Sequence, residues 1–401
     1  MRNRTVLISG GGIAGSALAY WLARYGFQPT VVERARDLRS SGSPVDVRGE
    51  AVEVAERMGV MAQLREAATH ATNLSFVNAN GRRIGRLAMS AMQQSGGASE
   101  VELPRGDLAG VLYRAARDSA EFVFDDSIAT LEQNEDGVDV TFDRTDPRRF
   151  DLVVGADGLH SMVRRLAIGA GPDTVRHMGM YVATLPLGGP AEDDQDILMY
   201  NTPGRAVSIH PSRGEALAAF MFRRPAVAGF DHHNTEQHKR LLVDAFAGSR
   251  WRVPELLDRV GVADDLYFDS VSQVRLSHWS YGRVTLLGDA ASCVSLFGEG
   301  SSLAITGAAT LAEALAANPD DHKTGFLRYE TEHRHLVEPK QRNVATASRL
   351  LVPATRLGIA TRNLATYLAP VAGVVQRVRA RRHDLGSAAL TPDPPAENLS
   401  T

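Results

Sequence analysis

Three glycines near the N-terminus have the spacing of a loop that binds phosphates. Gly10, Gly12 and Gly15 form the pattern G-x-G-x-x-G between an apolar run and a segment with helical periodicity. The first glycine permits a tight turn, the second lets a pyrophosphate approach the backbone, and the third lets the helix pack closely on the strand. Glu33 ends the next apolar run, where a carboxylate can accept hydrogen bonds from a ribose. Together these residues predict a dinucleotide site, and the pattern alone does not distinguish NAD from FAD.

Two later apolar runs also end at an aspartate beside a glycine. Residues 151–165 read DLVVGADGLHSMVRR, which places Asp157 after a buried strand and Arg164 in the helix that follows. Residues 286–304 read LLGDAASCVSLFGEGSSLA, which places Asp289 at the end of another strand. Strands of an open α/β sheet bind ligands at their carboxyl ends. We therefore expect Asp157 and Asp289 to lie near the N-terminal glycine loop.

The strands that carry these motifs predict an α/β domain interrupted by a second domain. Short alternating strands dominate from about residue 178 to 277, which indicates a mostly antiparallel sheet with one helical stretch near 234–247. Residues 36–50 are expected to form a polar loop. The predicted parts are a nucleotide-binding domain at 1–75, 101–177 and 278–340, an inserted substrate domain at 178–277 with a hairpin at 76–100, C-terminal helices at 341–385, and a disordered tail at 386–401.

The amino-acid composition argues against several classes of protein. The 401 residues carry a net charge of −3, without the basic field that binds nucleic acid. The single cysteine excludes an internal disulfide, and the 12 histidines lack the spacing of a metal site. The sequence has no clean apolar run of about 20 residues, so we predict no membrane span. We expect a cytoplasmic protein, monomeric or homodimeric, that binds a small molecule and no metal.

With these three motifs in this order, residues 4–340 resemble flavoprotein monooxygenases of the para-hydroxybenzoate hydroxylase class. Within that class the chain is most similar to compact bacterial members that modify polyketides and antibiotics. The resemblance implies a Rossmann-like FAD-binding domain (GR2-type), with substrate bound under the antiparallel sheet. It also implies that NADPH or NADH reduces the flavin and that a flavin C4a-hydroperoxide hydroxylates or epoxidises a large apolar, polyketide-like or aromatic substrate. Such an enzyme belongs to secondary metabolism.

The resemblance implies contacts for the nucleotide half of FAD. The pyrophosphate would lie against five residues of the first motif: Gly10, Gly12, Ile13, Ala14 and Gly15. Glu33 would bind the adenosine ribose, and Arg34 would lie beside the adenine. Asp157, supported by Arg164, would lie near the pyrophosphate and the approach of NAD(P)H.

It implies a second set of contacts for the flavin half. Arg48 and Arg105 would contact the flavin, and Asp289 would hydrogen-bond the ribityl chain. Backbone N–H groups would face flavin N1 and C2=O from Gly298, Gly300, Ser301 and Ser302. The positive end of a helix at this place would favour the negative charge that reduced flavin carries near N1.

The chain departs from the family pattern near the third motif. Many relatives have a histidine after Gly-Asp-Ala-Ala and a proline a few residues later, where this chain has Ser292 and Ser295. Glu299 replaces a residue that is often neutral, and it is either a solvent-facing residue or an acid with a tuned pKa inside the site. These departures leave an alternative function open, a non-redox cyclase of the [4+2] type that contains FAD and acts in natural-product biosynthesis.

No catalytic residue is assigned from the sequence, and the weak candidates are Arg48, Glu299 and His210. Four side chains in the predicted sheet domain are candidates for substrate contacts: Tyr200, His210, Phe220 and Phe222. Tyr200 or His210 would hydrogen-bond a substrate carbonyl or phenol. The alternative for these residues is that they are ordinary sheet residues.

Overall fold

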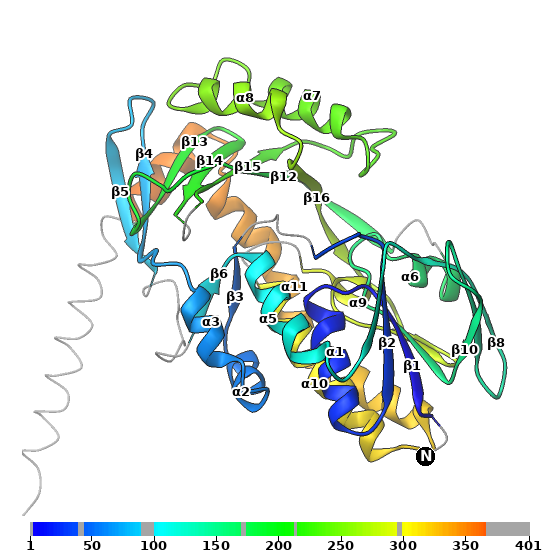
Figure 1. Cartoon of the computed structure of the whole chain (residues 1–401). Helices are drawn as coiled ribbons and strands as arrows, with labels where there is room; N and C mark the ends of the chain where they lie inside the picture. The colour runs from blue at the N-terminus through cyan, green and yellow to red at the C-terminus, as the bar shows by residue number, and fades with distance from the viewer. Residues whose placement is uncertain are drawn as a thin grey trace, which may run out of the picture.

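The computed structural model describes residues 3–38, 44–89, 100–169, 174–211, 215–294 and 299–365. The predicted tail at 386–401, the predicted helical residues beyond 365, and both Ser295 and Gly298 lie outside these ranges. The described chain forms a six-stranded and a seven-stranded sheet, and a long helix runs from one toward the other (Figure 1). This mixed α/β architecture with a parallel sheet confirms the predicted fold class.

The six-stranded sheet has the order β17-β18-β11-β1-β2-β7 and is parallel except for β17 at its edge. Its strands are β1 (Thr5–Ser9), β2 (Gln28–Glu33), β7 (Glu121–Phe124), β11 (Leu152–Gly155), β17 (Ser280–Tyr281) and β18 (Val284–Leu286). Consecutive residues of the central strands are buried, as in Val6, Leu7 and Ile8, so both faces of the sheet are covered. Such continuous burial explains why the sequence shows unbroken apolar runs here.

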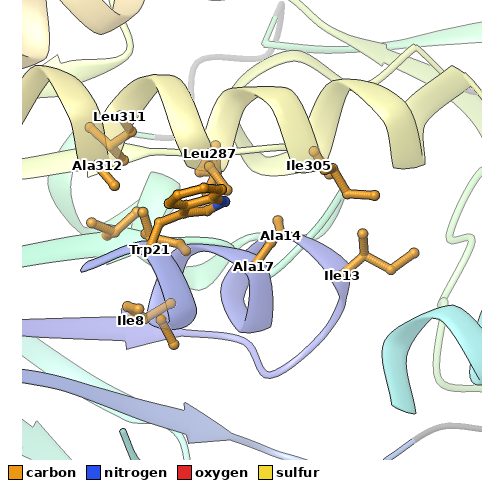
Figure 2. Close-up of a cluster of buried hydrophobic side chains, with 14 of the residues drawn as sticks. Ile8, Ile13, Ala14, Ala17, Trp21, Leu287, Ile305, Leu311 and Ala312 are labelled. Carbon is orange, nitrogen blue, oxygen red and sulfur yellow. The ribbon is translucent and has the colours of Figure 1, made fainter. Parts of the chain in front are cut away.

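Two helices pack tightly together against this sheet. They are α1 (Ile13–Arg24), which follows the glycine motif, and α10 (Glu299–Ala317), which follows the third motif. Figure 2 shows Trp21 of α1 beside Leu311 and Ala312 of α10, with Ile13 near Ile305 at the other end of the contact. Trp21 is 1% exposed, and burying a side chain of this size contributes roughly 1.5–3 kcal/mol. This packing fixes the N-termini of both helices relative to the strand ends.

The seven-stranded sheet has the order β16-β12-β15-β14-β13-β4-β5 and is antiparallel except for the β13–β4 pair. Its strands are β4 (Asn73–Val77), β5 (Arg83–Ala88), β12 (Val175–Pro186), β13 (Asp196–Thr202), β14 (Arg205–His210), β15 (Leu217–Arg223) and β16 (Tyr267–Val274). The β4–β5 hairpin precedes the inserted domain in the sequence but forms part of the same sheet, because β4 pairs with β13. The domain boundaries remain predictions, and β4 and β12 begin a few residues before 76 and 178.

Opposite faces of this sheet have different neighbours. One face, with Tyr181 and Phe222, packs against α7 (Thr235–Phe246) and α8 (Val253–Val262), which lie beyond the sheet from the nucleotide-binding domain (Figure 1). The other face, with Met180, forms a separate apolar cluster. We call this second face the cofactor-facing face, because Asp269 on it pairs with His160 from the nucleotide-binding domain. The sequence predicted one helix here, and the structure adds α8.

A two-stranded ribbon forms where the sequence predicted only a polar loop. Strand β3 (Val45–Val47) lies within the predicted loop at 36–50 and pairs with β6 (Val101–Leu103). That prediction was wrong for these residues, because their pairing partner lies far away in the chain. A separate sheet consists of β8 (Ile128–Gln133), β9 (Val138–Phe142) and β10 (Arg148–Phe150). The short helices are α2 (Glu50–Arg57), α3 (Met61–Ala67), α5 (Arg105–Ala116), α6 (Met162–Ala167) and α9 (Asp289–Ser292).

Helix α11 (His322–Leu351) connects the two sheets (Figure 1). Its Gln341 side chain donates to the carbonyl oxygen of Val274 at 2.9 Å, while Gln273 donates to the carbonyl oxygen of Gln341 at 2.7 Å. A further helical segment begins at residue 356. Among the helices of the described residues, none has the length and apolar character needed to cross a membrane.

Candidate active site

The three predicted motifs meet at one edge of the parallel sheet. Strands β1, β11 and β18 are neighbours, so their carboxyl ends lie side by side. A Cβ atom at Gly10 would lie 2.6 Å from the carbonyl oxygen of Ala156, directly before Asp157. A Cβ atom at Gly288 would lie 3.1 Å from the Cβ of Ala14. The glycines therefore allow segments far apart in the sequence to approach within van der Waals contact.

The start of α1 fits a pyrophosphate. Within the described chain, no side chain caps this helix at Gly12, and its first turn holds no acidic residue. The space above Gly12 is open to 4 Å, whereas a Cβ at Gly15 would overlap the carbonyl oxygen of Gly10. Uncapped N–H groups and the positive end of the helix dipole attract phosphate oxygens. Ile13 and Ala14 are buried in this first turn, so they offer backbone rather than side-chain groups.

Glu33 holds the glycine loop in place. Its carboxylate accepts hydrogen bonds from the backbone N–H of Gly11 at 2.8 Å and of Ala35 at 2.9 Å. Each carboxylate oxygen retains acceptor capacity for a ribose hydroxyl. The predicted ribose contact stays a proposal, and the structure adds a second role for Glu33 that the sequence did not indicate.

Asp157 caps a helix in addition to lying at the sheet edge. It accepts hydrogen bonds from the Ser161 hydroxyl at 2.5 Å and from the backbone N–H of Met162 at 2.7 Å, at the start of α6. Arg164 is buried and donates to the carbonyl oxygens of Leu159 at 2.6 Å and Ala290 at 2.9 Å. Arg164 therefore joins the loop that follows Asp157 to the turn that begins at Asp289, and it links the second motif to the third.

Asp289 and the start of α10 form the other side of the site. The Asp289 Oδ1 atom lies 3.5 Å from where a Cβ at Gly300 would be, so the carboxylate faces the first turn of α10. Glu299 forms an ion pair with Lys340 of α11. Its side chain is 27% exposed, so it lies partly buried at the site's edge. Lys340 thus balances the negative charge of Glu299, for which the sequence indicated no partner.

Ser301 and Ser302 attach α10 to the β3–β6 ribbon. Their hydroxyls donate to the carbonyl oxygen of Asp46 at 2.6 and 2.9 Å, and the Ser302 hydroxyl accepts from the backbone N–H of Arg48 at 3.0 Å. Because these hydroxyls have protein partners, backbone N–H groups are what this turn offers to a flavin. The Arg48 side chain forms an ion pair with Asp46 at 2.6 Å.

Tyr267 is a residue of this site that the sequence reasoning missed. Burial raises the pKa of its phenol, as do the negative charges of Asp269 and Asp289, while Arg105 at the start of α5 lowers it. Tyr267 pairs with Thr184, and the next pair along the strands, Phe268 with Ala183, lies on the face covered by α7 and α8. Because side chains alternate along a strand, Tyr267 points to the cofactor-facing face. Arg105 and Asp289 are therefore close enough to Tyr267 for their charges to act on its phenol. No local signal marks Tyr267, because only strand register reveals the face it occupies.

An imidazole cluster lies between the two domains. His160 is 3.1 Å from both carboxylate oxygens of Asp269 and stacks on His232 with ring centroids 3.9 Å apart. Burial lowers the pKa of His232 to about 4, assisted by the nearby charges of His160, His233 and Arg34. Arg34 therefore lies near the loop that follows Asp157. Among the described residues, no group of three or more potential ligands could hold a metal ion.

The strand register separates the four substrate candidates. Tyr200, Phe220 and Phe222 belong to the cluster with α7 and α8, on the face turned away from the cofactor side. We therefore withdraw them as substrate contacts in favour of a packing role. His210 lies two residues after Ser208 on β14, so both side chains are on the same face, which is the cofactor-facing one. Its Nε2 lies 2.9 Å from the Ser208 hydroxyl, and burial lowers the pKa of His210 to about 4, so it is neutral near pH 7.

Comparison with known proteins identifies the family. Residues 3–343 match a family model described as an FAD binding domain. The chain is 40% identical over 344 residues to the uncharacterized protein MT1298 of Mycobacterium tuberculosis, covering 84% of this chain and 92% of the relative. It is 32% identical over 351 residues to a flavin-dependent monooxygenase of Legionella longbeachae, covering 85% and 88%. The crystal structure of tetracycline destructase Tet(51) matches with a TM-score of 0.80 at 29% identity, covering 91% of this chain and 95% of that one.

The chain belongs to the family of FAD-dependent monooxygenases that share this FAD binding domain. The predicted family, enzyme class and FAD cofactor are confirmed. The described residues fit the cofactor, because the open backbone at Gly12 and the uncapped start of α1 offer a place for its pyrophosphate.

Proposed function

We propose that this enzyme uses NADPH or NADH to reduce its FAD and inserts one atom of dioxygen into a large apolar substrate, polyketide-like or aromatic. The convergence of Gly12, Asp157 and Asp289 at one sheet edge, opposite the cofactor-facing face, carries this proposal. Bound FAD supplies the chemistry, since it accepts electrons from a nicotinamide and activates dioxygen when reduced. The chain's own residues bind the cofactor, orient the substrate and exclude water.

The cofactor-facing face supports a large, mostly apolar substrate. Met180, Met199 and Met221 line it, and unbranched thioether side chains adapt to irregular apolar ligands. The Ser208–His210 pair adds a polar group whose Nδ1 is buried and has no hydrogen-bond partner among the described residues. That atom is available to a carbonyl or phenol oxygen of the substrate. The similarity to Tet(51) supports a polycyclic, tetracycline-like ligand.

The contact assignments are part of the same proposal. Glu33 and Arg34 would bind the adenosine, Asp289 the ribityl chain, and Arg48 and Arg105 the flavin. The modest net charge of −3 supports a small-molecule enzyme that binds no nucleic acid. We further propose that it works in the cytoplasm as a monomer or homodimer.

The test is oxidation of NADPH or NADH by the FAD-loaded protein with dioxygen and a panel of polycyclic aromatic and polyketide compounds. We expect one compound to stimulate nicotinamide oxidation and to yield a product heavier by one oxygen atom. Conversion of a substrate without reductant would favour the non-redox cyclase instead. Failure of every compound to stimulate oxidation, in a protein that retains FAD, would exclude the proposed substrate class.

A pair of variants tests the cofactor assignments separately. Asp289→Ala should weaken FAD retention during gel filtration, because the carboxylate at the start of α9 is lost. Asp264→Ala, at an exposed position before β16, is the matched control and should retain FAD as the wild type does. Equal retention by both variants would remove Asp289 from the proposed site.

A further inference from the structure

Two carboxyl groups lie directly opposite each other in the β3–β6 ribbon. Asp46 of β3 pairs with Glu102 of β6 in the antiparallel register, which places both side chains on the same face. Asp46 is 6% exposed, and the Glu102 Oε2 atom is buried without a hydrogen-bond partner among the described residues. Two carboxylates at directly opposed strand positions repel each other when both are ionised. The arrangement therefore favours one proton bound by the pair.

One cation accompanies this pair. Arg48 lies two residues after Asp46 on the same face and contacts its carboxylate at 2.6 Å. The Nε of Arg48 is buried and has no partner among the described residues, so its guanidinium is not saturated by Asp46. A single guanidinium balances one carboxylate and leaves the second charge of the pair uncompensated.

Among the residues that the structure describes, no further cation acts on the pair. Arg48, Glu299 and Glu100 act on Asp46, while Asp46 and Arg48 act on Glu102. Lys340 is directed to Glu299, and Arg65 of α3, which packs on β6, is directed to Glu56. Burial raises the pKa of Asp46 to about 6, and burial with the Asp46 charge raises that of Glu102 to about 7. Both raised pKa values agree with two carboxyl groups that lie opposite each other in the ribbon beside one guanidinium.

The pair lies one layer behind the turn that we assign to the flavin. The Asp46 carbonyl oxygen accepts hydrogen bonds from both Ser301 and Ser302 in the first turn of α10. Arg48 is bound to the same turn through its backbone N–H. A negative charge at the N-terminus of α10 therefore acts on the pair across these residues, and its repulsion favours the protonated form of the carboxyl groups.

We propose that Asp46 and Glu102 form a positioning pair for Arg48 that takes up a proton when the flavin ring becomes negatively charged. The proton comes from water and ends on a carboxylate oxygen of the pair, while the electron pair on the ring comes from the reductant. With the proton on the pair, Arg48 is shared between one carboxylate and the ring; without it, two carboxylates compete for Arg48. This inference rests on the proposed placement of the flavin at α10.

The test measures proton uptake when the FAD-loaded protein is photoreduced in weakly buffered solution near pH 7, without nicotinamide. We expect greater uptake per flavin in the wild type than in Glu102→Gln, with Glu102→Asp restoring it. Glu132→Gln is the matched control, because Glu132 is exposed on β8, in a separate sheet, and it should keep the wild-type uptake. Asp46→Asn provides a second route to removing the pair and should also lose the extra uptake.

An infrared titration of the protein without FAD tests the pair by itself. The wild type should show a protonated carboxyl band that disappears between about pH 6 and pH 7 and is weaker in Glu102→Gln. Absence of that band at pH 6 would overturn the proposal that the pair binds a proton. Equal proton uptake by the wild type and both pair variants would overturn the coupling while leaving the proposed function intact. A wild-type chain that binds no FAD would instead remove the proposed function and this inference together.

Discussion

Replacing Glu33 with Gln separates the two roles that the structure gives to this residue. The carboxylate accepts from the N–H groups of Gly11 and Ala35, one on each oxygen. A glutamine keeps one acceptor oxygen, and its NH2 group then faces the other N–H. Leaving one such donor without its acceptor costs about 1–3 kcal/mol. Because Gly11 lies inside the phosphate-binding loop, we expect most of this cost to appear as disorder of the loop.

The corresponding loss of FAD affinity is roughly 5- to 150-fold, since about 1.4 kcal/mol changes an equilibrium constant tenfold. Quenching of flavin fluorescence on titration of the apoprotein measures the dissociation constant. Glu132→Gln, on an exposed position of β8, is the matched control and should bind FAD as the wild type does. An unchanged dissociation constant for Glu33→Gln would refute the argument that this carboxylate organises the loop.

Three further predictions follow from packing and from charge. Gly15→Ala would place a methyl group on the carbonyl oxygen of Gly10, and we expect a loss of about 3 kcal/mol or more, measured by urea unfolding; wild-type stability would contradict the assigned close approach. Phe220→Leu should lower stability by about 1–2 kcal/mol without changing the KM for substrate, whereas Met221→Ala should change KM, because the two side chains occupy opposite faces. The raised pKa of Glu102 means that the folded state binds more protons than the unfolded state between about pH 4 and pH 7. Stability should therefore fall as pH rises through this window, and Glu102→Gln should reduce that fall by on the order of 2 kcal/mol; an equally steep profile for the variant would show that Glu102 titrates normally.

The predictions that the structure confirmed came from short sequence patterns, each of which has one physical interpretation. A glycine loop between a buried strand and a helix leaves few alternatives, because only glycine tolerates the close approach of Gly10 to Ala156. Unbroken apolar runs predicted the parallel strands, and the rule that parallel strands end at one edge predicted that Asp157 and Asp289 would meet. Each of these inferences needs only a few neighbouring residues.

The predictions that failed or were missing depended on pairing across long distances. Strand β3 looks like loop sequence until β6 supplies its partner, and the opposition of Asp46 to Glu102 follows only from that pairing. Alternation within β13 and β15 separates two faces but does not say which one the helices α7 and α8 cover. The sequence alone therefore did not determine which face of the sheet Tyr200 and Phe220 occupy.

By itself the sequence determined a dinucleotide loop, two Asp–Gly strand ends and an inserted antiparallel sheet, since backbone geometry constrains those patterns locally. Only the tertiary structure decided which side of the inserted sheet meets the cofactor, that Lys340 neutralises Glu299, and that Tyr267 joins Arg105 at the site. These outcomes depend on strand register and on contacts between distant segments, where one residue's shift reverses the face of a side chain.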